Sequence, residues 1–173
     1  MTSLFGRALG VAAFALMATS VVAQETDALV AVMTDWSVFN PPEEPKICFG
    51  VSAPKETVNI RDGQPVSVRR GDILLFVTFI PGQPGAISFS GGYPFAEGST
   101  VDLAIDGTSF QLLPGGEWAW PGSVEDDAIL LAALKKGTTA VLKARSGKGT
   151  ETTDTFSLRG FTAAMEDAEK RCK

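Results

Sequence analysis

The sequence contains no histidine, two cysteines and one tyrosine among its 173 residues. The absence of histidine removes the commonest metal ligand and the commonest general base of enzymes. The two cysteines, Cys48 and Cys172, do not have the Cys-x-x-Cys spacing of a thiol redox site. We therefore expect no catalytic residue, no metal site and no cofactor.

Basic residues are also scarce, because 15 lysines and arginines stand against 20 acidic residues, for a net charge of −5. Nucleic acids and anionic membrane surfaces select for basic patches, so this balance argues against both as partners. After residue 23 the sequence has no apolar run of 18 residues. We expect no membrane-spanning segment in that part of the chain.

Residues 1–23 have the features of a cleavable secretory signal peptide. Arg7 supplies the positive n-region, residues 8–17 form the apolar h-region, and Val21-Val22-Ala23 place small or modest residues before Gln24. Cleavage would leave 150 residues, the length of one ordinary domain. The sequence therefore predicts one domain over 24–173 that is exported to the periplasm or secreted.

Two cysteines in an exported domain favour a disulfide. A Cys48–Cys172 bond would close a loop of 123 residues, for which the chain-entropy treatment gives about 4–5 kcal/mol of stabilisation. Two free thiols or a redox pair are the alternatives, and the missing Cys-x-x-Cys spacing disfavours the second.

Alternating apolar residues and frequent Gly and Pro turns predict a mainly β domain with eight or so short strands. The clearest signals are two hairpins, 101–113 with the turn pair Asp106-Gly107, and 139–158 with the turn 146–149. Further strands are expected over 35–40, 46–52, 64–68, 73–80 and 86–90. Residues 73–80 are apolar on both faces apart from Thr78, which predicts a central strand covered from two sides. A β-sandwich is the favoured architecture and a small β-barrel the second choice.

Two short helices complete the predicted fold. The first is capped by Ser123, carries acids in its first turn and ends at Lys135-Lys136 before Gly137. Its expected apolar stripe consists of Val124, Ala128, Leu131 and Leu134. The second runs from about Phe161 to the end, with Phe161, Met165, Ala168 and Cys172 on one face. Cys172 would then face the body of the protein, where Cys48 is within reach if the helix lies across that strand's sheet.

Three motifs carry weak catalytic signals, and each favours a structural interpretation. Ser52-Ala53-Pro54-Lys55 has the Ser-x-x-Lys spacing, but Pro54 disfavours the helix which that chemistry requires. Gly147-Lys148-Gly149-Thr150 lies between strands and reads as a turn rather than a phosphate-binding loop. The acids Asp102, Asp106 and 125–127 are explained by a solvated strand face, a turn and a helix start.

Aromatic residues are the candidate binding residues. Trp118 and Trp120 lie two apart on a strand-like segment, so their side chains point the same way. They either fill the core beside the first helix, which we favour, or form a patch for a partner, since tryptophan is enriched at binding hot spots. Tyr93, in a glycine-rich turn, raises the same question.

Several segments, in order along the chain, resemble the invasion-associated locus B family. They are Asp35-Trp36-Ser37-Val38-Phe39, Ile47-Cys48-Phe49, Gly92-Tyr93-Pro94-Phe95, Ile105-Asp106-Gly107, Asp154-Thr155-Phe156-Ser157-Leu158, Gly160-Phe161-Thr162-Ala163-Ala164 and the terminal Cys172. The resemblance implies an immunoglobulin-like β-sandwich exported to the envelope of an alphaproteobacterium. It implies no catalytic residues and no cofactor, and it transfers a cysteine pair onto Cys48 and Cys172.

The leading hypothesis for function is a non-enzymatic periplasmic protein that binds an envelope or secreted protein partner. A surface-displayed or secreted factor that contacts host cells during invasion is the alternative, and a small carboxylate-based hydrolase is a remote one. The sequence does not identify the partner.

Overall fold

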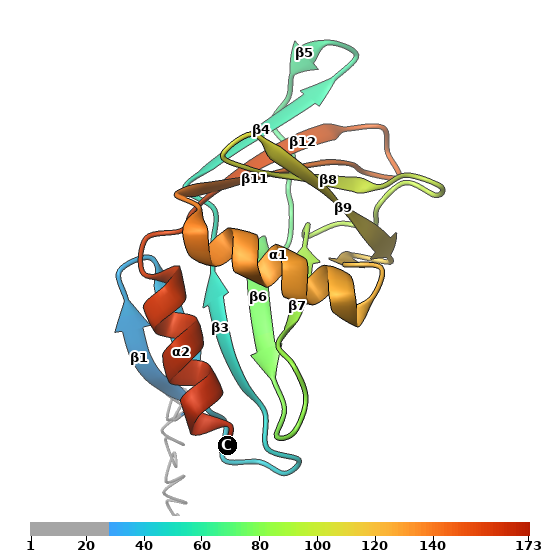
Figure 1. Ribbon diagram of the computed structural model, residues 1–173. Coiled ribbons are helices and arrows are strands. Elements are labelled where there is room, and N and C mark those ends of the chain that lie inside the picture. The colour runs from blue at the N-terminus through green and yellow to red at the C-terminus, as the bar shows by residue number, and fades with distance from the viewer. Residues whose placement is uncertain (1–27) are drawn as a thin grey trace, which may run out of the picture.

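The computed structural model describes residues 28–173, and the predicted signal peptide lies outside the described residues (Figure 1). These residues form one antiparallel sheet of twelve strands and two α-helices. The sheet bends into two halves, called here the lower and upper halves after their places in Figure 1.

The lower half contains six strands in the spatial order β1-β2-β3-β6-β7-β10. Their bounds are β1 (Leu29–Met33), β2 (Trp36–Phe39), β3 (Cys48–Ser52), β6 (Leu74–Phe79), β7 (Ala86–Ser90) and β10 (Trp118–Trp120). The predicted strands over 35–40, 46–52, 73–80 and 86–90 are confirmed, whereas β1 was not predicted.

The upper half continues in the order β9-β8-β11-β12-β4-β5. Its strands are β4 (Glu56–Arg61), β5 (Gln64–Pro65), β8 (Val101–Ile105), β9 (Thr108–Gly115), β11 (Thr139–Arg145) and β12 (Glu151–Ser157). Both predicted hairpins are present, and the turn residues Asp106 and Gly107 have φ of 46° and 91°, as a type I′ turn requires. The expected strand over 64–68 is wrong beyond Pro65, and β4 was not predicted.

Strand β9 joins the two halves, because it pairs with β8 through Thr108–Leu112 and with β10 through Leu113–Gly115. In Figure 1 the upper strands run across the lower ones. The inner faces pack together, and the rings of Phe89 on β7 and Phe156 on β12 meet edge to face at 6.2 Å between centroids. The predicted mainly β architecture with two short helices is confirmed. The second choice, a small β-barrel, is wrong because β1 and β5 are the two end strands of the described sheet and do not pair with each other, so the sheet is not closed.

Helix α1 (Val124–Lys136) begins after Ser123, whose Oγ accepts the backbone N–H of Asp126 at 3.1 Å, as predicted. The predicted apolar stripe is wrong at Val124 and Ala128, which are exposed, and the fully buried positions are Leu130 and Leu134. The reason is tertiary: the carboxylate of Asp127 accepts the backbone N–H of Ile87 at 2.7 Å. This contact places Asp127, rather than Ala128, against strand β7.

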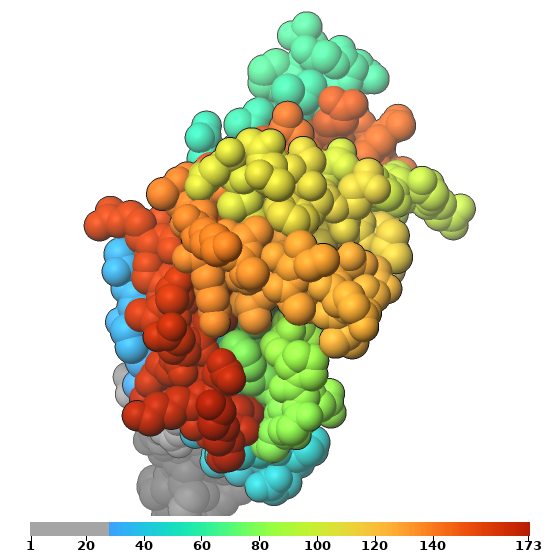
Figure 2. Space-filling view, in the orientation of Figure 1, coloured from blue at the N-terminus to red at the C-terminus, as the bar shows by residue number. Residues whose placement is uncertain are grey.

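Helix α2 (Phe161–Arg171) packs on the inner side of β2 and β3. The predicted face is confirmed, since Phe161, Met165, Ala168 and Cys172 are all buried. Phe161 meets Trp36 edge to face at 4.8 Å. In Figure 2, α1 (orange) and α2 (red) lie on the side of the molecule that faces the viewer.

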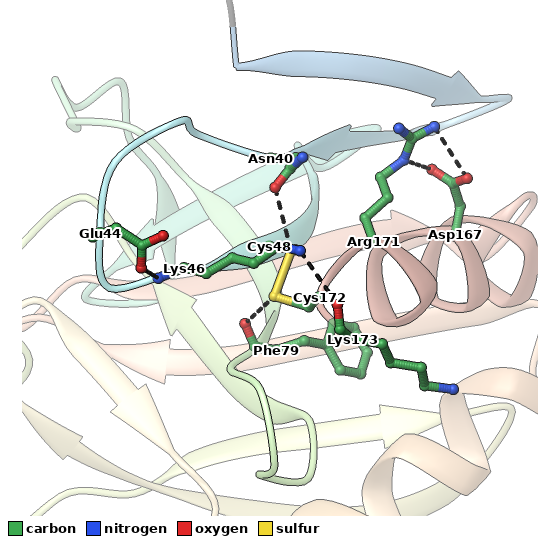
Figure 3. Close-up of a disulfide and its surroundings, with 9 residues drawn as sticks. All are labelled: Asn40, Glu44, Lys46, Cys48, Phe79, Asp167, Arg171, Cys172 and Lys173. Atoms are coloured by element: carbon green, nitrogen blue, oxygen red, sulfur yellow. Dashed lines mark hydrogen bonds and ion pairs between the residues drawn. A yellow bond between two sulfur atoms is a disulfide. The ribbon is translucent and has the colours of Figure 1, made fainter.

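The structure joins Cys48 to Cys172 in a disulfide, as predicted (Figure 3). Both residues are buried, and Cys172 Sγ lies 3.1 Å from the carbonyl oxygen of Phe79. The bond attaches the end of α2 to β3, which is a central strand of the lower half. It therefore fastens the last helix over the inner face of the sheet.

Candidate functional site: an aromatic row on the outer face of the sheet

The outer face of the lower half, on the side away from α2, is apolar and partly exposed within the described residues. Strand β6 shows an alternation, since Leu75, Val77 and Phe79 are buried on its inner face while Leu74 and Phe76 are only partly buried on its outer face. The prediction that this strand is covered from two sides is therefore wrong. The helix and the upper half cover the inner face, and none of the described residues forms a layer over the outer one.

Four aromatic side chains form a continuous row across this outer face, from β2 to β10. Phe39 stacks on Phe49 with 5.0 Å between ring centroids and 9° between planes. Phe49 is followed by Phe76 at 5.9 Å, and Phe76 by Trp118 at 5.6 Å. We call Phe39, Phe49, Phe76 and Trp118 the aromatic row. Offset aromatic pairs at such distances are mutually stabilising, so the row is an ordered surface.

The two tryptophans predicted as candidate binding residues lie on β10 with the same orientation. Trp118 is 39 % exposed and Trp120 is 44 % exposed, while Ala119 between them is fully buried. The favoured alternative, in which both fill the core, is wrong because the residue between them takes the inward position. Trp118 belongs to the aromatic row, and the ring of Trp120 lies over Gly115 instead.

A hollow of about 390 Å³ adjoins the β2 end of the row and is lined by Val32, Phe39, Val51 and Leu74 among others. Its rim carries an ion pair between Lys55 Nζ and Asp35 Oδ1 at 2.6 Å. The hydrogen bond from Lys55 is the main reason that the pKa of Asp35 lies below its ordinary value. The row therefore has apolar surroundings with one neutralised ion pair at the edge.

The Ser-x-x-Lys motif belongs to this rim and has a structural role. Ser52 Oγ donates to the carbonyl oxygen of Asp35 at 2.7 Å, while Lys55 is paired with the Asp35 carboxylate. The residues between them form the connection from β3 to β4, as the sequence predicts, and not a helix. The serine hydroxyl thus fixes the start of β2 relative to the end of β3.

Tyr93, the third candidate binding residue, lies elsewhere, above a buried polar network. Its hydroxyl forms a hydrogen bond with the hydroxyl of Thr152 at 2.5 Å, and its ring covers the Arg70 guanidinium at 4.9 Å. Burial raises the pKa of Tyr93, and the hydrogen bond to Thr152 opposes that rise. The structure therefore does not bring Tyr93 together with Trp118 and Trp120.

Arg70 and Asp154 form the centre of this network. Their side chains are 6 % and 0 % exposed, and Arg70 Nη1 and Nη2 reach the two carboxylate oxygens at 2.8 and 2.6 Å. The remaining donors of Arg70 bind the carbonyl oxygen of Gly91 and the side chain of Asn59, so all five N–H groups have acceptors. Burial raises the pKa of Asp154, and the bonds from Arg70 oppose that rise.

The acids considered for catalysis have structural partners. Asp106 accepts the hydroxyl and the N–H of Thr138 and the N–H of Thr139, which hold its pKa below the ordinary value. Asp102 accepts from Gln111 across the hairpin at 3.3 Å. At the start of α1, Asp126 contributes its backbone N–H to the cap and Asp127 binds β7.

Sequence reasoning missed the other three members of the row, Phe39, Phe49 and Phe76. A signal was present, because strands 46–52 and 73–80 each carry large apolar side chains on the face that the structure leaves uncovered. Reading that signal requires knowledge of which face the helices and the upper half cover.

Residues 36–169 match the model of the family described as "Invasion associated locus B (IalB) protein". The chain belongs to the invasion associated locus B family. The match ends before Cys172, so the disulfide is a finding of the structure itself.

A solved structure has the same fold as this invasion associated locus B family member. It is the crystal structure of invasion associated protein b from Bartonella henselae, with 16 % sequence identity and a TM-score of 0.53. The alignment covers 80 % of this chain and 94 % of that one. A search of curated proteins gives no match. Within residues 28–173, no helix has the length and apolar character needed to cross a membrane.

Proposed function

We propose that this invasion associated locus B family member is a non-enzymatic, exported protein of the bacterial envelope that binds a protein partner on its aromatic row. The family membership and the disulfide support export, because disulfides persist in oxidising compartments. The buried or partnered state of Asp154, Asp106 and Asp127 supports a binding role over a carboxylate-based hydrolase.

The uncovered outer face of the lower half carries this proposal. Large apolar side chains on one face of a sheet gain about 25 cal/mol per Å² when another layer removes them from water. Here β3 and β6 supply such side chains on both faces, while the described chain supplies a layer for the inner face alone. A second protein provides the missing layer.

The dimensions of the row favour a protein over a small ligand. From β2 to β10 the row crosses four strand spacings, β2-β3-β6-β7-β10, which amounts to about 19 Å. The surface is a sheet face with a shallow hollow at one end rather than an enclosed cavity. Aromatic side chains at the centre of such a surface are typical hot spots. The partner that fits is a protein with an apolar patch and little charge at its centre.

Site-directed photo-crosslinking in intact cells tests the proposal. A benzoylphenylalanine at Ser37, on the outer face beside the row, should crosslink a partner protein that mass spectrometry identifies. The same group at Ile129, which is 59 % exposed on α1, is the control and should not capture that partner. A crosslink from position 37 to a second copy of the chain instead would contradict the proposal.

The purified partner then allows a quantitative test. Phe49→Ser and Trp118→Ala should each weaken its affinity by about tenfold or more, as for hot-spot truncations, whereas Ile129→Ser should leave it unchanged. Urea unfolding of each variant separates loss of binding from loss of folding. If Phe49→Ser unfolds, Trp118→Ala still decides the matter, because its ring is more than a third exposed. Affinities of the wild-type value in both variants would overturn the proposal.

Export has its own test. Fractionation should place the protein in the periplasm or the medium, with an N-terminus at Gln24 after signal cleavage. A full-length chain that stays in the cytoplasm would contradict this part of the proposal. Location solely in the periplasm would exclude the alternative in which the protein contacts host cells.

A further inference from the structure

A second concave surface lies over the Arg70–Asp154 network, apart from the aromatic row. It is a pocket of about 650 Å³ between the end of β4, the segment after β5, the turn that carries Tyr93 and the β11–β12 turn. Pockets that hold small molecules have volumes of about 300–1,000 Å³. The size therefore suits a small organic ligand or a headgroup.

The lining is basic in a protein that is acidic overall. Arg61, Arg69 and Lys148 line the pocket with one acid, Glu117, whereas the whole chain has a net charge of −5. None of these four residues has an ion-pair partner within residues 28–173. Arg70 also lines the pocket, but Asp154 neutralises it and all its donors are used. Three cations against one acid leave the lining of the pocket with a net positive charge.

The guanidinium of Arg61 is held in place by two hydrogen bonds and keeps further N–H donors for a ligand. Its Nε and Nη2 donate to the buried Thr150 Oγ1 at 3.1 and 2.6 Å. A guanidinium has five N–H donors, so three of them have no acceptor among the described residues. Arg61 is therefore an oriented guanidinium, and such groups bind phosphate or carboxylate oxygens in pairs.

The floor of the pocket is rigid. Tyr93, Thr152, Arg70 and Asp154 are linked by hydrogen bonds and by the contact of the Tyr93 ring with the guanidinium. Ser146 Oγ, at the β11–β12 turn, accepts the backbone N–H of Thr150. A site fixed before its ligand arrives avoids part of the ordering cost of binding.

We propose that this pocket binds a phosphoryl group, carried by a small molecule or by a lipid headgroup. Arg61, Arg69 and Lys148 outnumber the one acid, Glu117, so the pocket favours a ligand with more than one negative charge. A phosphate monoester or diphosphate meets that requirement better than a single carboxylate. Arg61 binds the phosphoryl oxygens directly, and Arg69 and Lys148 at the exposed rim supply attraction. Glu117 opposes binding.

Calorimetric titration of the purified protein, with its disulfide intact, tests the proposal. The soluble probes are pyrophosphate and glycerol 3-phosphate, compared with sodium chloride at equal ionic strength. The membrane-presented probe is a phosphatidylcholine vesicle that contains phosphatidic acid, measured by co-sedimentation. Binding to either kind of probe supports the site and identifies its source. Absence of binding to both at millimolar phosphate would overturn it.

Charge variants decide whether the pocket is responsible. Arg61→Gln should weaken binding about tenfold, the effect of losing one charge-assisted hydrogen bond. Lys148→Gln should weaken it by less, because Lys148 is exposed and contributes attraction only. Lys170→Gln, on the exposed surface of α2, removes the same charge elsewhere and should have no effect. Glu117→Gln should strengthen binding, a gain that mere loss of structure cannot produce. Unchanged affinity in Arg61→Gln and Glu117→Gln would refute the assignment. Phe49→Ser, which alters the aromatic row and not the pocket lining, should bind the phosphate probes as the wild type does, so this test is independent of the proposed function.

Discussion

The buried Arg70–Asp154 pair makes a prediction whose size follows from its geometry. Replacing Arg70 by Met leaves the fully buried Asp154 carboxylate without its two donors, at 2.8 and 2.6 Å in the wild type. Removing one partner of such a pair costs about 3–5 kcal/mol. Whole domains of this size are stable by about 5–15 kcal/mol. We therefore expect Arg70→Met to lose a large share of the free energy of unfolding.

The double variant Arg70→Met, Asp154→Leu separates the pair from its surroundings. Apolar replacements of similar volume remove both the attraction and the cost of burying charge, so the double variant should be more stable than Arg70→Met alone. Urea unfolding followed by circular dichroism gives the three free energies and their coupling. The reasoning is refuted if Arg70→Met costs less than about 1 kcal/mol or if the double variant loses the sum of the single losses.

The pH dependence of Arg70→Met gives an independent check with a defined sign. Burial already raises the pKa of Asp154 in the wild type, and loss of Arg70 removes the interaction that opposes this rise. An acid with a raised pKa in the folded state favours folding at low pH, and this contribution is lost as pH rises through the folded pKa. The stability gap between wild type and Arg70→Met should therefore narrow as pH falls below neutral. A gap that widens would contradict the assignment.

Three further predictions concern the frame of the molecule. The double variant Cys48→Ala, Cys172→Ala opens a loop of 123 residues. Its free energy of unfolding in urea should fall by about 4–5 kcal/mol, and its m-value should be larger. An unchanged midpoint of urea unfolding would contradict this prediction. Gly160→Ala should lower the free energy of unfolding by at least about 2 kcal/mol, because φ is +87° and a Cβ would collide with the backbone of Met33. Gly63→Ala is the control, since its φ is +74° but its surroundings are open, and it should lower the free energy of unfolding by about 1 kcal/mol. Asp106→Asn should destabilise the protein at neutral pH. The pKa of Asp106 is lowered in the folded state, so this group stabilises the fold at pH values above its unfolded-state pKa. The difference in free energy of unfolding between wild type and Asp106→Asn should therefore vanish as pH falls through the folded-state pKa.

Features that depend on local chemistry could be predicted from the sequence. The pair Asp106-Gly107 forms its turn because both residues tolerate positive φ, and Ser123 caps α1 because its hydroxyl reaches Asp126 within one turn. The spacing of Phe161, Met165, Ala168 and Cys172 placed the last cysteine against the body. The disulfide partner followed because the chain has one other cysteine.

Features set by tertiary contacts could not be predicted. Strand β4 is mostly polar and has no buried residue, so its two alternating apolar residues, Val58 and Ile60, give a weak signal. It forms because it pairs with β12. The rotation of α1 follows from the bond between Asp127 and Ile87, residues 40 apart in the chain. Tyr93 could not be placed because its partners, Arg70 and Thr152, come from different strands and loops.

The aromatic row shows what apolar alternation does and does not determine. Apolar side chains on both faces of residues 73–80 predict a strand that is covered from two sides. In the structure the described residues supply a layer on one side alone. Folding buries Leu75, Val77 and Phe79, while Leu74 and Phe76 keep part of their apolar surface exposed. Hydrophobic burial does not depend on whether the covering atoms belong to the same chain. A sequence that is too apolar for its own fold therefore contains information about a partner, and Phe49→Ser is the substitution that tests this without touching the inner core.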